Sequence, residues 1–106
     1  MCLSLLFMSS IIPKKCESFQ YSSHAVKRML EKGITTYELE QTAEYSEAIQ
    51  LYEDDKPFPS ELILNFISNR PIHIVLAQNK IGKECIIITC YEPDVAIWEI
   101  DFKTKR

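Results

Sequence analysis

The chain has 106 residues, of which 46% are hydrophobic, 25% charged and 10% aromatic. This length predicts one domain, and the composition is that of a globular protein rather than a disordered one. The presence of only two glycines and five prolines excludes a collagen-like or low-complexity chain. A formal net charge of −3 provides no overall basic field of the kind that marks many nucleic-acid binders.

The charges are unevenly distributed along the chain. Residues 38–61 hold eight acidic side chains and one basic one, whereas residues 1–37 and 62–106 are each net positive. An acidic middle between two basic ends permits a polyanionic partner in spite of the negative total. The acidic segment is also a candidate docking surface for a basic protein.

Residues 1–17 are expected to be an N-terminal extension of a single domain at residues 18–106. Residues 3–12 are apolar, but this run is shorter than the roughly 20 residues that span a bilayer and lacks the flanks of a signal peptide. No C-x-x-C pair occurs among the four cysteines, which are Cys2, Cys16, Cys85 and Cys90. We therefore expect reduced thiols in a cytoplasmic protein that does not associate with membranes. Met8 is an alternative start.

Two helices are predicted next. Ser22 and Ser23 are suitable N-cap residues for the first helix, and Gly33 is suited to the left-handed conformation that ends it. The apolar face between these ends is formed by Ala25, Val26, Met29 and Leu30. Thr35 and Glu38 form a capping box that begins the second helix, which is expected to end near residues 45–46.

The rest of the chain is rich in strand-forming residues. Four strands are predicted, at residues 48–52, 62–67, 72–77 and 85–91. A short strand at residues 18–21 is expected to add to one edge of their sheet. The predicted order of elements is (β)ααββββ, followed by a tail from residue 95 to residue 106.

His73 interrupts a strand that is otherwise apolar. With tight pairing across both hairpins, it faces Asn65 on one side and Thr89 on the other, with Tyr91 further along the same face. A polar cluster at one end of an aliphatic sheet surface is suited to a general acid or base beside a phosphate. A hydrogen-bonded core histidine is the alternative.

Candidate phosphate-binding cations occur in two places. One set, spaced by single turns on the polar face of the first helix, is His24, Arg28 and Lys32. The other set, at the end of the tail, is Lys103, Lys105 and Arg106. A solvated surface is the alternative for both sets. Trp98 is interpreted as a hydrophobic anchor of the tail, and the cysteines as small buried side chains.

Four segments resemble a family of short bacterial proteins known as a domain of unknown function. They are residues 23–34 (SHAVKRMLEKGI), 70–75 (RPIHIV), 86–93 (IIITCYEP) and 98–106 (WEIDFKTKR). That family is similar to the RelE/ParE toxins of type II toxin–antitoxin modules. The resemblance implies a RelE-like α+β fold, with two N-terminal helices packed on a curved antiparallel four-stranded sheet and a C-terminal tail. The predicted order of elements agrees with that fold.

The resemblance also implies an activity. RelE-like ribonucleases polarise the scissile phosphate while a ribose 2′-OH attacks it, without a metal ion or other cofactor. The residues implied as catalytic are His24, His73 and Tyr91. The residues implied for substrate binding are Arg28, Lys32, Lys103 and Arg106. The implied partners are RNA and a small antitoxin with a zinc-binding part and a helix-turn-helix part.

Two hypotheses about function follow. The first is a toxin that acts as a metal-independent endoribonuclease, with His73 and Tyr91 handling protons and the cations binding phosphate. The second is a non-enzymatic protein-binding module of the same fold that docks through the acidic residues 38–61. In the first case we expect replacement of His24 and His73 to abolish RNA cleavage.

Overall fold

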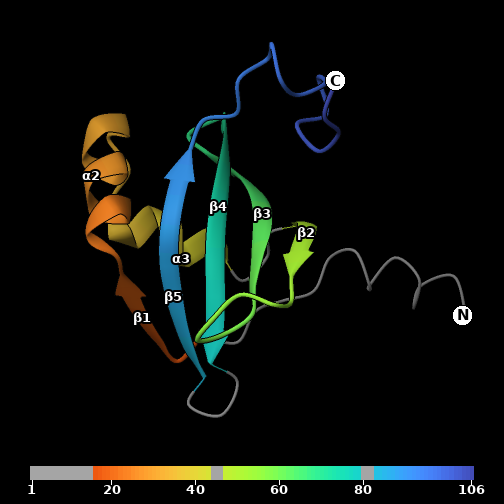
Figure 1. The fold of residues 1–106 in the computed structure, drawn as a ribbon. Helices are drawn as coiled ribbons and strands as arrows, with labels where there is room; N and C mark the ends of the chain where they lie inside the picture. The colour runs from red at the N-terminus through yellow and green to blue at the C-terminus, as the bar shows by residue number, and fades with distance from the viewer. Residues whose placement is uncertain (1–15, 44–46, 80–82) are drawn as a thin grey trace, which may run out of the picture.

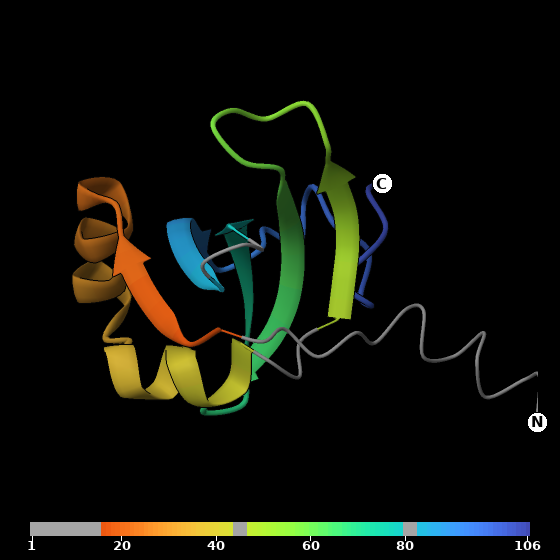
Figure 2. The same cartoon turned by 90° about the horizontal axis from the view of Figure 1, so that it is seen from below.

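The computed structural model describes residues 16–43, 47–79 and 83–106. Its helices are α2 (Ser23–Lys32) and α3 (Thr36–Ala43). Its strands are β1 (Ser18–Tyr21), β2 (Glu47–Tyr52), β3 (Ser60–Ile67), β4 (Arg70–Asn79) and β5 (Glu84–Tyr91). The strands form one sheet, with α3 across one face and α2 beside β5 and β1 (Figures 1 and 2).

The sheet corrects the expected fold class. It has five strands in the order β1-β5-β4-β3-β2, and it is mixed rather than antiparallel, because β1 pairs with β5 in parallel. The α+β class holds, but the four-stranded antiparallel sheet does not. Strands β1 and β5 come from opposite ends of the chain, so no local pattern in the sequence could reveal their pairing or its direction.

Both predicted helix starts are confirmed by their hydrogen bonds. The Ser22 hydroxyl accepts the Ala25 N–H at 3.0 Å and donates to the Ile88 carbonyl of β5 at 2.6 Å. Gly33 ends α2 with a φ of 68°. In the capping box, Thr35 N–H donates to the Glu38 carboxylate at 3.0 Å and Glu38 N–H donates to the Thr35 hydroxyl at 3.1 Å. These bonds satisfy backbone donors that the helices cannot pair themselves.

Replacing Ser22 with alanine is expected to lower the free energy of unfolding by about 1–2 kcal/mol. The hydroxyl serves both the helix cap and β5, so its loss leaves two backbone groups without this partner. Urea unfolding followed by circular dichroism measures the change. Ser23→Ala is the matched control, since Ser23 is exposed on the first turn of the same helix; equal losses in both variants would contradict the double role of Ser22.

The β3–β4 hairpin sets the register of His73. Ser68 and Asn69 form its two-residue turn with φ values of 52° and 65°, which are left-handed values typical of tight hairpin turns. His73 therefore pairs with Leu64, and the expected pairing with Asn65 is wrong by one residue. A shift of one residue moves a side chain to the other face of a sheet, so Asn65 lies on the face opposite His73.

The β4–β5 pairing also differs from the expected one. His73 pairs with Tyr91, whereas Thr89 pairs with Val75. Ile88 of β5 forms a bulge opposite Val75 and Leu76, because Val75 pairs with Thr89 and Leu76 pairs with Ile87. This bulge shifts the register by one residue. His73 and Tyr91 are therefore direct neighbours, closer than their expected diagonal arrangement.

The two faces of the sheet are both apolar but pack differently. One face forms the core with the helices, through Ala25, Met29, Leu39, Ile63, Ile72, Ile74 and Cys90. Because side chains alternate along a strand, His73 points away from this core, between Ile72 and Ile74. Other buried residues on that second face are Leu62 and Leu64. The C-terminal tail packs there as well.

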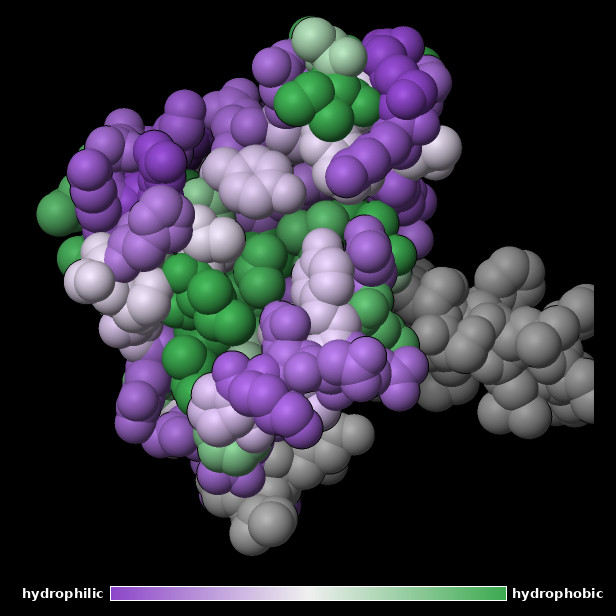
Figure 3. Space-filling view, in the orientation of Figure 1, coloured by the Kyte–Doolittle hydropathy of each residue, from purple (hydrophilic) through white to green (hydrophobic). Residues whose placement is uncertain are grey.

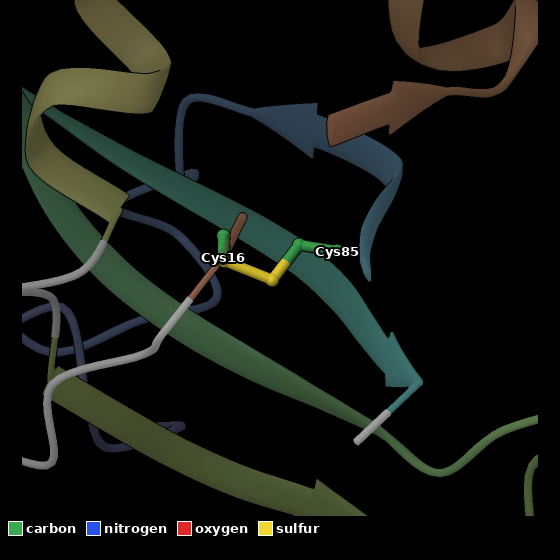
Figure 4. The surroundings of a disulfide bond; sticks show 2 residues. All are labelled: Cys16 and Cys85. Atoms are coloured by element: carbon green, nitrogen blue, oxygen red, sulfur yellow. A yellow bond between two sulfur atoms is a disulfide. The ribbon is translucent and has the colours of Figure 1, made fainter. Parts of the chain in front are cut away.

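A disulfide corrects the expectation of reduced thiols. Cys16 is bonded to Cys85, with their Cα atoms 5.5 Å apart and a sequence separation of 69 (Figure 4). Cys90 is a free thiol and is fully buried, as expected. Cys2 lies outside the described residues. Within the described part of the chain, neither helix is both long and apolar enough to cross a membrane.

Candidate functional site

The candidate site is built on a row of paired residues that crosses four strands. Register places Glu47 of β2, Leu64 of β3, His73 of β4 and Tyr91 of β5 side by side. All four belong to the face away from the helices, because directly paired residues share a face. His73 is fully buried within this row, and Tyr91 is half-buried.

Both ring nitrogens of His73 have partners. Nε2 lies 2.7 Å from the Phe102 carbonyl oxygen, and Nδ1 lies 3.3 Å from the Tyr91 hydroxyl. A carbonyl can only accept, so Nε2 carries the proton and Nδ1 accepts from Tyr91 in the neutral imidazole. The ring also meets Trp98 edge-on, with centroids 4.6 Å apart. His73 therefore ties the tail to the sheet.

The tail forms a compact turn over this end of the sheet (Figure 1). Trp98 bridges to Lys105, and Arg106 N–H donates to the Ile97 carbonyl at 2.8 Å. Phe102 adopts a left-handed φ of 59°, and its carbonyl is the one that accepts from His73. Trp98 is 6% exposed, which confirms the prediction that it anchors the tail.

Two of the three tail cations are held by carboxylates, and the third, Lys105, lies over the Trp98 ring. Lys103 Nζ lies 3.1 Å from a Glu47 oxygen, at the β2 end of the row that contains His73. Arg106 lies 3.1 Å from Glu99 and also donates from Nε to the Val95 carbonyl at 2.7 Å. Exposed pairs of this kind contribute about 0–1 kcal/mol each, so a phosphate would displace the carboxylates at small cost.

The predicted site residues fall into two groups. His73, Tyr91 and Lys103 lie together at the tail end of the sheet. His24, Arg28 and Lys32 are instead exposed on α2. Arg28 pairs there with Glu31 at 3.0 Å. The expected Asn-His-Thr-Tyr cluster is reduced to His73 and Tyr91 in direct contact, with Thr89 diagonal on the same face.

Two participants were missed from the sequence. Glu47 was counted only as part of an acidic segment, and its pairing with Lys103 joins residues 56 apart in the chain. The Phe102 carbonyl is a backbone group, so no side-chain pattern could signal it. Only the folded tail brings either of them to the row that holds His73.

The space beside this row is lined by aliphatic side chains. Figure 3 shows hydrophobic residues along the middle of this face, between α2 on the left and the tail at the upper right. Half-buried residues that register assigns to this face include Val75, Ile86 and Thr89. The polar side chains of α2 and those of the tail therefore border this apolar strip on its two sides.

The acidic segment does not form one surface. Glu40 accepts a hydrogen bond from Tyr21, Glu47 pairs with Lys103, and Asp55 accepts from Ser60. Glu53 and Asp54 are exposed on the loop between β2 and β3. Several of the acids thus serve internal contacts, and the loop carries the exposed part of the charge.

Burial controls the protonation of the central pair. It lowers the pKa of His73 below the ordinary 6.5, and the hydrogen bond to the Phe102 carbonyl opposes this shift. Burial also raises the pKa of Tyr91, and the nearby Tyr52 adds to the rise. At neutral pH the pair is therefore an uncharged imidazole facing a protonated phenol.

The stability of the domain is expected to fall as the pH drops below about 6.5. In the unfolded chain His73 takes up a proton near its ordinary pKa of 6.5, whereas in the folded protein its pKa is lower. The contribution of the neutral imidazole is thus complete above pH 6.5 and is lost as the pH falls toward the folded-state pKa. Urea midpoints measured between pH 7.5 and 5 should show this loss.

His73→Gln is the test variant, because glutamine can still donate to the Phe102 carbonyl but does not titrate. Its urea midpoint should depend less on pH over this range, although it is lower at pH 7.5. Replacement of the exposed His24 by alanine is the matched control. An unchanged acid dependence in His73→Gln would assign the effect to other groups.

The structure therefore defines a small α+β protein with a buried histidine–tyrosine pair closed by its own C-terminal tail. The family model described as Domain of unknown function (DUF4258) matches residues 21–92, and the chain belongs to this family. The matched region includes His24, Arg28, His73 and Tyr91 and ends before the tail. Searches of curated proteins and of solved structures gave no match.

Proposed function

We propose that this protein is the toxin component of a bacterial type II toxin–antitoxin module and acts in the cytoplasm as a metal-independent endoribonuclease. The observation that carries this proposal is the contact between His73 Nδ1 and the Tyr91 hydroxyl beside a cationic tail. The resemblance between the family to which the chain belongs and the RelE/ParE toxins supports the same activity.

The hydrogen-bond directions favour Tyr91 as the group that meets the substrate. The phenol oxygen accepts the proton of the ribose 2′-OH while the phenol proton passes to His73 Nδ1. The resulting imidazolium keeps its Nε2 proton on the Phe102 carbonyl, which stabilises the positive charge. The 2′-oxygen then attacks phosphorus and the 5′-oxygen leaves with a proton taken from solvent, which produces a 2′,3′-cyclic phosphate and a 5′-hydroxyl end. The imidazolium releases its Nδ1 proton to solvent through the Tyr91 hydroxyl.

The cations have a separate role in this proposal. Lys103 is next to Phe102 in sequence, so a phosphate that takes the place of Glu47 would be held beside the His73–Tyr91 pair. Arg106 contributes a planar guanidinium to the same tail. His24, Arg28 and Lys32 on α2 extend the binding surface for the RNA backbone.

Cleavage of a synthetic RNA tests the proposal. The RNA is incubated with the purified chain in the presence of a chelator, with and without ribosomes, and the product ends are determined. The expected result is a 2′,3′-cyclic phosphate and a 5′-hydroxyl. A single 2′-deoxy substitution at the mapped site should abolish cleavage there. Intact RNA under both conditions, or cleavage of the deoxy substrate, would contradict the proposal.

The proposal also includes a protein partner. A small antitoxin with a zinc-binding part and a helix-turn-helix part is the expected inhibitor.

A non-enzymatic role, in which the chain docks onto a basic protein, is the second candidate function. It is favoured by the exposure of Glu53 and Asp54 on one loop. Replacing both with lysine should abolish that docking and leave RNA cleavage in place.

A further inference from the structure

We propose that the Cys16–Cys85 disulfide is a redox-sensitive latch that holds the edge strand β1 on β5, so that its reduction loosens β1 and uncovers the outer edge of β5. The latch concerns the fold itself and does not depend on RNA cleavage. It follows from where the bond lies, from what else holds β1, and from which sulfur a reductant can reach.

The disulfide lies at the N-terminal end of β1, which is called its outer end below. The inner end is the C-terminal one, where β1 leads into α2. Cys16 lies two residues before the first residue of this strand, and Cys85 is the second residue of β5 (Figure 4). Strand β1 is short, with four paired residues, and it is the last strand of the sheet on this side. A short edge strand has neighbours on one side only and is among the first elements of a fold to open.

The two ends of β1 are held in different ways. At the inner end, Ser22 N–H donates to the Ile87 carbonyl at 3.0 Å and its hydroxyl donates to the Ile88 carbonyl. At the outer end, Glu17 N–H donates to the Lys83 carbonyl at 2.8 Å, and the Glu17 and Lys83 side chains form an exposed pair. The exposed pair adds little, so the disulfide is the main constraint on the outer end.

Other contacts of β1 are modest. Tyr21 donates to Glu40 of α3, and Phe19 is half-buried against the core. Gln20 donates to Glu84 on the exposed side. Tyr21 adjoins Ser22, so both strong side-chain bonds are at the inner end. Reduction should therefore open β1 from the outer end and leave α2 docked on β5.

The geometry also selects the sulfur that reacts. Cys85 is fully buried, whereas Cys16 is partly exposed. A thiolate of a dithiol reductant, either a small dithiol or a dithiol protein, attacks Sγ of Cys16 and displaces the Cys85 thiolate. The second thiol of the reductant then releases Cys16. Two electrons and two protons have passed to the protein, which has gained two thiols, and the reductant has become a disulfide.

A latch of this kind matters most in a cytoplasm, where reducing systems act on accessible disulfides. Persistent disulfides are rare there, and those that form are usually transient and redox-sensing. The edge that β1 covers carries the backbone groups of residues 84–87. Uncovered, it presents unpaired N–H and C=O groups on which another strand could add.

Hydrogen exchange of individual amides tests the latch. The chain with Cys2→Ser is compared before and after reduction with dithiothreitol, at a temperature where both forms are folded. We expect the amides of Glu17 and of β1 to exchange at least tenfold faster after reduction. Loss of the cross-link speeds exchange in every strand, but in the reduced form the Ser22 amide and the amides of β3 and β4 should still exchange at least tenfold more slowly than those of β1, because local opening of β1 does not expose them.

Two control variants accompany the comparison. Cys90→Ala should behave like the parent, because Cys90 is buried and burial raises the pKa of its thiol, which keeps it unreactive. Cys16→Ser should exchange like the reduced form without any reductant. Equal protection of β1 in both redox forms would overturn the latch. Exchange of β1 at the same rate as β3 and β4 in the reduced form would also overturn it, because the bond would then contribute to global stability alone.

Discussion

Replacing Tyr91 with phenylalanine is expected to lower the rate of RNA cleavage by about 10²–10⁴-fold, the usual contribution of general acid–base catalysis. The hydroxyl is the only part of the side chain that is removed, and it is the group that contacts His73 Nδ1 at 3.3 Å. The ring would keep its edge-on packing against His73, with centroids 5.3 Å apart. Single-turnover cleavage of the synthetic RNA measures the change, because it separates chemistry from product release.

Tyr37→Phe is the matched control for Tyr91→Phe. It removes another tyrosine hydroxyl, which is exposed on α3 and lies away from the row that holds His73. Its cleavage rate should stay within about threefold of the parent, since it alters no proposed reacting group. Far-ultraviolet circular dichroism establishes that both variants are folded. Equal rates for Tyr91→Phe and the parent would remove Tyr91 from the proposed chemistry while leaving the fold intact.

Cys16→Ser is expected to lower the free energy of unfolding by about 4 kcal/mol, because the disulfide closes a loop of 69 residues. For a domain of this size such a loss corresponds to a fall in Tm on the order of 20 °C. The variant leaves the Cys85 thiol buried in its place, and the new hydroxyl is at a partly exposed position. The loss in the free energy of unfolding therefore measures the contribution of the cross-link, because the substitution creates no cavity in the core.

Denaturant unfolding of the oxidised parent, the reduced parent and Cys16→Ser measures this effect. The reduced parent and the variant should have matching midpoints, and dithiothreitol should not alter the variant further. A parent whose midpoint is the same in both redox forms would show that the cross-link adds no stability. The resistance of the core to unfolding would then rest on the packing between sheet and helices.

The local signals in the sequence were sufficient for the individual elements. Ser22, Gly33, Thr35 and Glu38 marked the helix ends, and each acts there through a bond or a backbone angle within a few residues. These capping contacts join residues only a few positions apart, so they do not depend on how the helix packs against the rest of the fold. The strands were found for the same reason, since β-branched runs between turn residues are a local pattern.

The candidate site was predicted in part. His73 was identified because a histidine within an apolar strand is unusual, and Tyr91 because it falls on a neighbouring strand. Their direct contact was not predicted, because it depends on the register between β4 and β5, which a bulge at Ile88 of β5 shifts by one residue. A register error of one residue separates neighbours or places them on opposite faces. His24 and Arg28 were identified by their spacing on the polar face of the first helix, and the structure places them on α2, exposed.

The sequence by itself determined where the helices and strands lie and which side chains are unusual for their element, whereas of the predicted apolar face of α2 only Ala25 and Met29 are buried. The tertiary structure alone decided that β1 joins β5 in parallel, that Cys16 meets Cys85, and that Phe102 closes over His73. Each of these contacts joins residues far apart in the chain. Their formation depends on how the whole core packs and on the entropy of closing long loops, and neither quantity is present in any short stretch of sequence.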